Sequence, residues 1–159
     1  MAVVTKYGLG YKDPASTQLP KPVYAEGRGR CIVTGTIVAA NGDSIASKHY
    51  LGKIPSHAII LPDSSLIHGA ITGLTSYHIG LELNGAVVDV DCLAAALDLS
   101  TAGTKTLTAL LVASGIGKQV WQVAAAPRDP GVVYDVVGVM NAAATASANL
   151  ELFLKYLIK

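Results

Sequence analysis

The chain has 159 residues, of which 51% are hydrophobic and 14% are charged, and its net charge at pH 7 is +1. This length predicts one domain with a buried core, and the near-zero charge excludes general electrostatic binding of nucleic acid. About a quarter of residues are charged in an average protein, so these charges cannot cover the whole surface. Two explanations stay open: a partner covers an apolar part of the surface, or the surface is rich in alanine and glycine.

The two cysteines, Cys31 and Cys92, are far apart and do not form a disulfide framework. Both lie in apolar stretches, which favours buried free thiols and synthesis in a reducing compartment. The N-terminus lacks a hydrophobic run of signal-peptide length, and no apolar stretch approaches the roughly 18 residues of a membrane span. We therefore expect synthesis in a cytoplasm and no membrane partner.

Residues 1–29 show no hydrophobic period and contain three prolines and four glycines. Proline removes a ladder donor and glycine raises the entropy cost of ordering, so we predict an extended, irregular N-terminal arm ahead of a β-domain at residues 30–159. Tyrosines, which are enriched at interfaces, are spread among its basic residues. The arm either lies on a neighbouring subunit or is a loosely ordered tail. The candidate partner-binding residues are Lys6, Tyr7, Tyr11, Lys12, Lys21, Tyr24, Arg28 and Arg30.

Short β-strands separated by turn signals follow the arm. Residues 30–40 are rich in β-branched side chains and predict the first strand, which ends at the Asn-Gly-Asp turn of residues 41–43. Asn84-Gly85 predicts a two-residue hairpin turn. Further strands are predicted at 47–54, 57–61 with 66–71 as its possible continuation, 75–83, 86–90, 105–113, 119–125 and 132–140.

Alternation predicts which side chains share a face of these strands. Residues 47–54 place Lys48, Tyr50 and Ile54 on one face. In residues 75–83, odd-numbered positions such as Tyr77 and Ile79 face one way. Trp121 is expected to face the core from its strand.

Residues 91–98 are the exception, because alanine is the best helix former and Asp91 is a suitable N-cap. We predict one short helix there and a loop at 142–148. Residues 150–159 fit either an alternating strand with Ile158 inward or a helix, since Glu151 and Lys155 are four apart. The β-rich context favours the strand.

Eight or nine short strands with turn signals every 8–12 residues and no β-α alternation predict an all-β fold. The fold class is therefore an antiparallel β-sandwich with about eight strands, one short helix and an irregular arm. A jelly roll of two four-stranded sheets fits this count.

No pattern indicates catalytic, cofactor-binding or metal-binding residues, and we expect no enzymatic activity. The four histidines lack the tight spacing of a zinc site, although His68 and His78 could meet across paired strands. Gly-Asp-Ser at 42–44 is interpreted as a turn, and residues 115–118 lack the spacing of a phosphate loop. A Ser-His-Asp triad assembled in space stays open.

Several stretches across residues 31–140 resemble a family of small head proteins of tailed bacteriophages, the capsid decoration or cement proteins built on a jelly roll. The stretches are 38–44 (VAANGDS), 50–56 (YLGKIPS), 58–60 (AII), 70–73 (AITG), 77–81 (YHIGL), 85–89 (GAVVD) and 93–100 (LAAALDLS). The resemblance implies a virion protein on the capsid exterior, bound to the major capsid protein as a homo-oligomer, a dimer or trimer, without enzymatic activity.

A clamp of this kind fits physical expectation, because binding only the assembled shell stabilises it and one oligomer can engage several subunits. The alternative function is a glycan- or receptor-binding jelly-roll module of a phage tail or fibre, which needs exposed aromatic and polar groups around a concavity.

Overall fold

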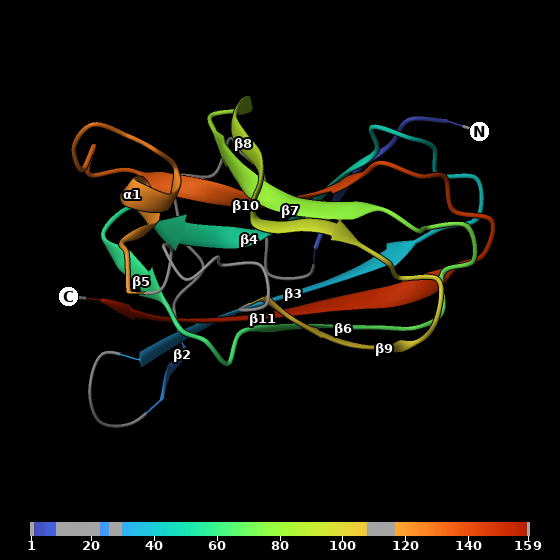
Figure 1. Cartoon of the computed structure of the whole chain (residues 1–159), viewed down its shortest axis with the longest axis horizontal. Helices are drawn as coiled ribbons and strands as arrows, with labels where there is room; N and C mark the ends of the chain where they lie inside the picture. The colour runs from blue at the N-terminus through green and yellow to red at the C-terminus, as the bar shows by residue number, and fades with distance from the viewer. Residues whose placement is uncertain (1, 9–22, 26–29, 108–116, 159) are drawn as a thin grey trace.

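We describe the fold from a computed structural model, which covers residues 2–8, 23–25, 30–107 and 117–158, with the backbone alone at 23–25, 30 and 31. Strands dominate these residues (Figure 1). The elements are β1 (Thr5–Tyr7), β2 (Val23–Ala25), β3 (Arg30–Ala39), β4 (Lys48–Pro55), β5 (Ala58–Ile60), β6 (Ser65–His68), β7 (Tyr77–Leu83), β8 (Ala86–Leu97), β9 (Gly103–Thr106), α1 (Val120–Val123), β10 (Val133–Met140) and β11 (Ala148–Ile158).

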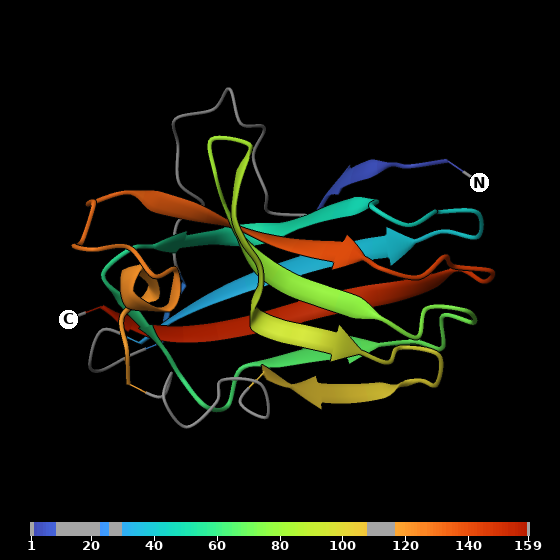
Figure 2. The ribbon, with the colours of Figure 1, turned by 45° about the horizontal axis from the view of Figure 1, so that its top comes forward.

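The strands form two sheets that pack face to face (Figures 1 and 2). The five-stranded sheet has the order β1-β4-β10-β7-β8, and the six-stranded sheet has the order β2-β3-β11-β6-β9, with β5 paired to β11. Apart from β1, which runs parallel to β4, every named strand pair is antiparallel. The predicted all-β antiparallel sandwich is confirmed.

Eight of these strands follow the connectivity of a jelly roll. With β1, β2 and β5 set aside, the first strand pairs with the last, the second with the seventh, the third with the sixth and the fourth with the fifth. These pairs are β3–β11, β4–β10, β6–β9 and β7–β8, and they alternate between the two sheets. A long hairpin folded over on itself gives this double Greek key.

The core lies between the sheets and consists of aliphatic side chains from both. Leu51 and Ile79 enter it from the five-stranded sheet, and Leu66 and Leu152 enter from the six-stranded sheet, each with 0% exposure. Strand β7 keeps its predicted alternation, with Tyr77, Ile79 and Leu81 inward. Strand β11 is a strand as favoured, but Ile158 is exposed rather than inward because the sandwich ends before it.

The helix prediction at residues 91–98 is wrong, because β8 continues through Leu97. Leu93, Ala94 and Leu97 are buried against the core, and this packing outweighs the helix propensity of the alanines. The helix is instead α1, inside the segment predicted as a strand at 119–125. Trp121 therefore lies half-buried on a helix, where its Nε1 donates to Gln119 Oε1 at 2.8 Å.

A bulge in β4 changes the face that Tyr50 presents. The β10 register passes from Gly52 opposite Val136 to Tyr50 opposite Val137, which leaves Leu51 as the extra residue. Tyr50 therefore packs with Val137 outside the main core, whereas Ile54 is inside it. The predicted shared face of Tyr50 and Ile54 is wrong, because the period of two is interrupted between them.

Two short parts of the segment predicted as an arm belong to the sheets. Strand β1 extends the five-stranded sheet beside β4, and β2 extends the six-stranded sheet beside β3. Residues 9–22 and 26–29 lie outside the described residues, as does most of the strand predicted at 105–113, of which β9 covers only the start. The division at residue 29 stays a prediction.

Candidate partner-binding surface

Strand β1 is fastened to the sandwich by backbone and side-chain contacts. Lys48 N donates to Val4 O at 2.8 Å and Gly8 N donates to Tyr50 O at 2.7 Å, on either side of the short ladder. The Lys6 ammonium forms an ion pair with Asp43 and donates to the carbonyl oxygen of Val38 at 2.9 Å. Lys6, predicted as a partner-binding residue, therefore has its charge engaged within the chain.

Asp43 and His49 form a buried polar cluster beneath β1. Asp43, predicted as a turn former, is 5% exposed and accepts from Ala40 N at 2.9 Å, so it closes its turn and also binds Lys6. His49 is 0% exposed, with Nδ1 3.1 Å from Tyr77 Oη and Nε2 3.9 Å from Asp43 Oδ2. Burial, aided by the Lys6 charge and opposed by Asp43, lowers the pKa of His49 to about 4. His49 is therefore neutral at pH 7.

Tyr7 is the predicted contact residue that the structure places on the outside. Its ring is 50% exposed and stacks on Tyr50 with centroids 4.9 Å apart. Tyr50 Oη donates to Glu82 at 2.7 Å, and Lys48 Nζ donates to the same carboxylate at 2.5 Å. Burial and the bond to Glu82 raise the pKa of Tyr50. The outer face of the five-stranded sheet thus carries a fixed tyrosine pair beside β1.

The predicted contact residues do not gather on one described face. Lys6 and Tyr7 are on β1, whereas Tyr24 and Arg30 are on β2 and β3 of the other sheet, where only their backbone is described. The other four, Tyr11, Lys12, Lys21 and Arg28, lie outside the described residues.

One exposed apolar feature was not identified from the sequence: residues 84–91, which we name the valine hairpin. It comprises the β7–β8 turn and the first half of β8. It projects from the five-stranded sheet in both ribbon views (Figures 1 and 2). Its valines Val87, Val88 and Val90 are 52%, 37% and 44% exposed. The available signal was the consecutive Val87-Val88 pair, because neighbouring strand residues point to opposite faces and a half-buried strand would not be apolar on both.

Gly80 allows the valine hairpin to lie close over β7. A Cβ atom at Gly80 would lie 2.0 Å from the carbonyl oxygen of Asp89 and 2.6 Å from that of Val90. The β7–β8 register also shifts at this point. A small depression between the valine hairpin and the sheet is lined partly by Val87, Val137 and Val139.

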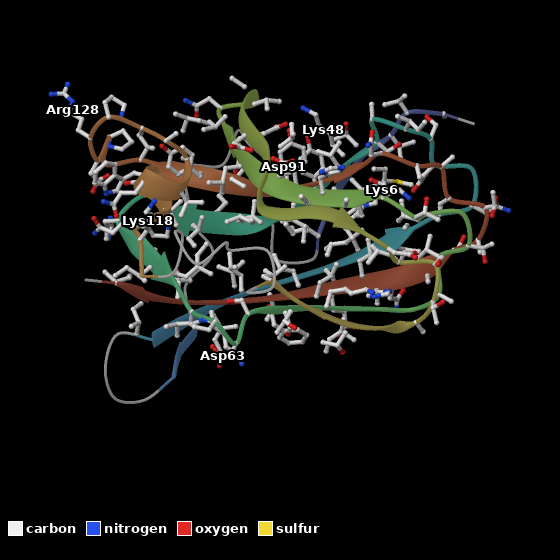
Figure 3. The ribbon with its side chains drawn as sticks, in the orientation of Figure 1. Lys6, Lys48, Asp63, Asp91, Lys118 and Arg128 are labelled. Carbon is white, nitrogen blue, oxygen red and sulfur yellow. The ribbon has the colours of Figure 1, made fainter. Side chains whose placement is uncertain are left out.

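Charged groups are spread over both sheets and one end of the sandwich. Figure 3 shows Lys6, Lys48 and Asp91 on the side of the five-stranded sheet, Asp63 beside the six-stranded sheet, and Arg128 near α1. Asp63 pairs with Lys155 at 3.0 Å, whereas Asp91 has His78 Nδ1 at 3.7 Å.

Cys92 is a free thiol, as predicted, but it is half-buried rather than buried. Burial, with smaller effects of Asp89 and Asp91, raises the pKa of its thiol to about 12, so the nucleophilic thiolate is scarce at neutral pH. The side chain of Cys31 is outside the description.

The described residues contain no group of three or more His, Cys, Asp or Glu that could hold a metal ion. His68 and His78 do not meet across paired strands, since β6 and β7 belong to different sheets. Among the same residues no helix is long and apolar enough to cross a membrane.

No protein-family model matches this chain, and no curated protein sequence matches it either. Two solved structures share its fold. A chain of the "Cyanophage Pam1 capsid asymmetric unit" is 14% identical with a TM-score of 0.58, and the match covers 95% of this chain and 100% of that one. A chain of the "Capsid of Ralstonia phage GP4" is 16% identical with a TM-score of 0.55, covering 89% of this chain and 91% of that one.

Proposed function

We propose that this chain is a structural virion protein of a tailed bacteriophage, a decoration or cement protein that binds the outside of the major capsid lattice. It acts as a small homo-oligomer, is made in the host cytoplasm, and stabilises the head without catalysing a reaction. The main support for this proposal is that its jelly roll is similar to chains from two phage capsids. Each match covers nearly the full length of this chain and of the matched chain.

The chain lengths favour an accessory subunit. Because each match covers at least 91% of the other chain and 89% of this one, the matched chains are close to this chain in size. The likeness is therefore to whole small proteins rather than to one domain of a larger shell subunit. A separate small protein adds stability to a shell by binding only its assembled form.

The surface chemistry fits a binding role. The tyrosine pair Tyr7–Tyr50 and the three exposed valines lie on the side of the five-stranded sheet. Tyrosine is enriched at protein interfaces, and clustered exposed apolar side chains mark interaction sites. A chain with 14% charged residues has few charged groups to surround them.

Purified protein mixed with bare, expanded heads of its own phage tests the proposal. We expect extra density on the outer surface by electron microscopy and co-sedimentation that saturates at a fixed ratio to the shell subunit. Unexpanded shells serve as the control for lattice-dependent binding. Bare heads that gain no density after mixing would show that the protein does not decorate them.

A further inference from the structure

The valine hairpin exposes apolar side chains on both of its faces. Val87 and Val88 are neighbours in β8 and so point to opposite faces, and both are more than a third exposed, as is Val90. On one side, Val87 and Val90 border the small depression together with Val137 and Val139 of the sheet. A flat partner would cover one face only, whereas a groove would also reach the valines beside that depression.

The turn and the base of the valine hairpin have a defined backbone geometry. Asn84 and Gly85 have φ values of 52° and 78°, as a type I′ turn requires at both central positions. At its base, the Asp89–Val90 backbone packs directly over Gly80, where a side chain would not fit. A rigid projection loses little conformational entropy when it binds.

Acidic side chains on the valine hairpin indicate which charges should line the edge of that groove. Asp89 and Asp91 flank Val90, and Asp91 N donates to Asp89 Oδ1 at 3.1 Å. The Asp91 side chain is 46% exposed, with His78 Nδ1 3.7 Å from its Oδ2. Two acidic groups beside apolar side chains fit a groove bordered by lysine or arginine.

We propose that residues 84–91 insert into an apolar, cation-bordered groove on a shell subunit. This inference rests on the proposed function and names the part of the chain that makes the contact.

The apolar half of the proposal is tested with Val87→Thr, Val88→Thr and Val90→Thr combined, since threonine keeps the β-branched shape. Val38→Thr with Ile67→Thr is the matched control, because these residues are 50% and 42% exposed on the other sheet. We expect the triple variant to bind heads more than about tenfold more weakly, the loss typical of an interface hot spot. The control should bind as the wild type does.

The charged half is tested with Asp89→Asn and Asp91→Asn combined. Asp63→Asn is the control, because its side chain is also 46% exposed but lies beside the other sheet. Affinity for heads should fall several-fold and depend less on salt in the double variant only, since screening acts on charges across an interface. Circular dichroism and melting temperature verify that every variant is folded.

The outcomes separate this inference from the proposed function. If the wild type does not bind heads, the proposed function fails and this inference fails with it. If the wild type binds and the triple threonine variant binds equally well, or the control loses as much, only the groove is refuted. If the triple variant breaks up an oligomer in sedimentation and still binds heads, a second copy covers the valines and the inference is wrong.

Discussion

His49 is buried as a neutral imidazole between Tyr77 and the Lys6–Asp43 ion pair. Its pKa is about 4 in the folded chain against 6.5 when unperturbed. Between these values the unfolded chain binds a proton that the folded chain does not, so stability is full above pH 6.5 and falls as pH drops toward 4.

The predicted loss of folding free energy is on the order of 3 kcal/mol across this range. Urea unfolding at pH 7, 6, 5 and 4.5 would measure it. His49→Gln keeps a hydrogen-bonding side chain without this titration and should show a flatter pH profile. Equal pH profiles for the two proteins would contradict the assignment of this loss to His49.

At the scale of elements, the two sheets approach closely where Gly35 of β3 lies against Leu51 of β4. A Cβ atom at Gly35 would lie 1.8 Å from the carbonyl oxygen of Leu51. Leu51 is also the bulged residue of β4, so the bulge brings its backbone against β3. Backbone atoms in a sheet cannot move aside as a flexible side chain can.

Gly35→Ala should therefore destabilise the protein by about 3 kcal/mol or more, at the upper end of the cost of overpacking. Gly103→Ala is the control, since nothing lies within 4 Å of a Cβ atom there. Chemical denaturation compares the two. Similar midpoints for both variants would mean that the sheets adjust to the added methyl group.

At the scale of the whole molecule, the eight-stranded jelly roll does not include β1 or β2. A chain of residues 30–159 should therefore keep a β-rich fold, as the predicted domain division requires, but lose head binding if the arm carries contacts. It should also be less stable, because the deletion removes the β1 ladder and the ammonium group that pairs with Asp43.

Circular dichroism, denaturation and co-sedimentation with heads measure these three effects. Asp43→Asn in the shortened chain is the control, since removing the charge that has lost Lys6 should restore part of the stability. Unchanged head binding by residues 30–159 would show that the arm is not the attachment site.

The alternation of Tyr77, Ile79 and Leu81 and the Asn84-Gly85 turn could be predicted from the sequence, because both depend on residues close together in the chain. Because many segments show such local patterns, the sequence predicted an all-β sandwich. The alanine-rich part of β8 was wrongly predicted as a helix, because burial of Leu93 and Leu97 outweighs local propensity. The segment that contains α1 was wrongly predicted as a strand.

Only the tertiary structure decided where side chains that are alike in sequence end up. Lys6 is anchored on Asp43 although it sits among basic residues that suggested a contact surface, and the valines of β8 are exposed although valine usually enters the core. The sequence by itself determined the strand and turn pattern, which local chemistry dictates. Burial was decided by contacts between segments far apart in the chain, because a side chain's environment depends on which strands pack above and beside it.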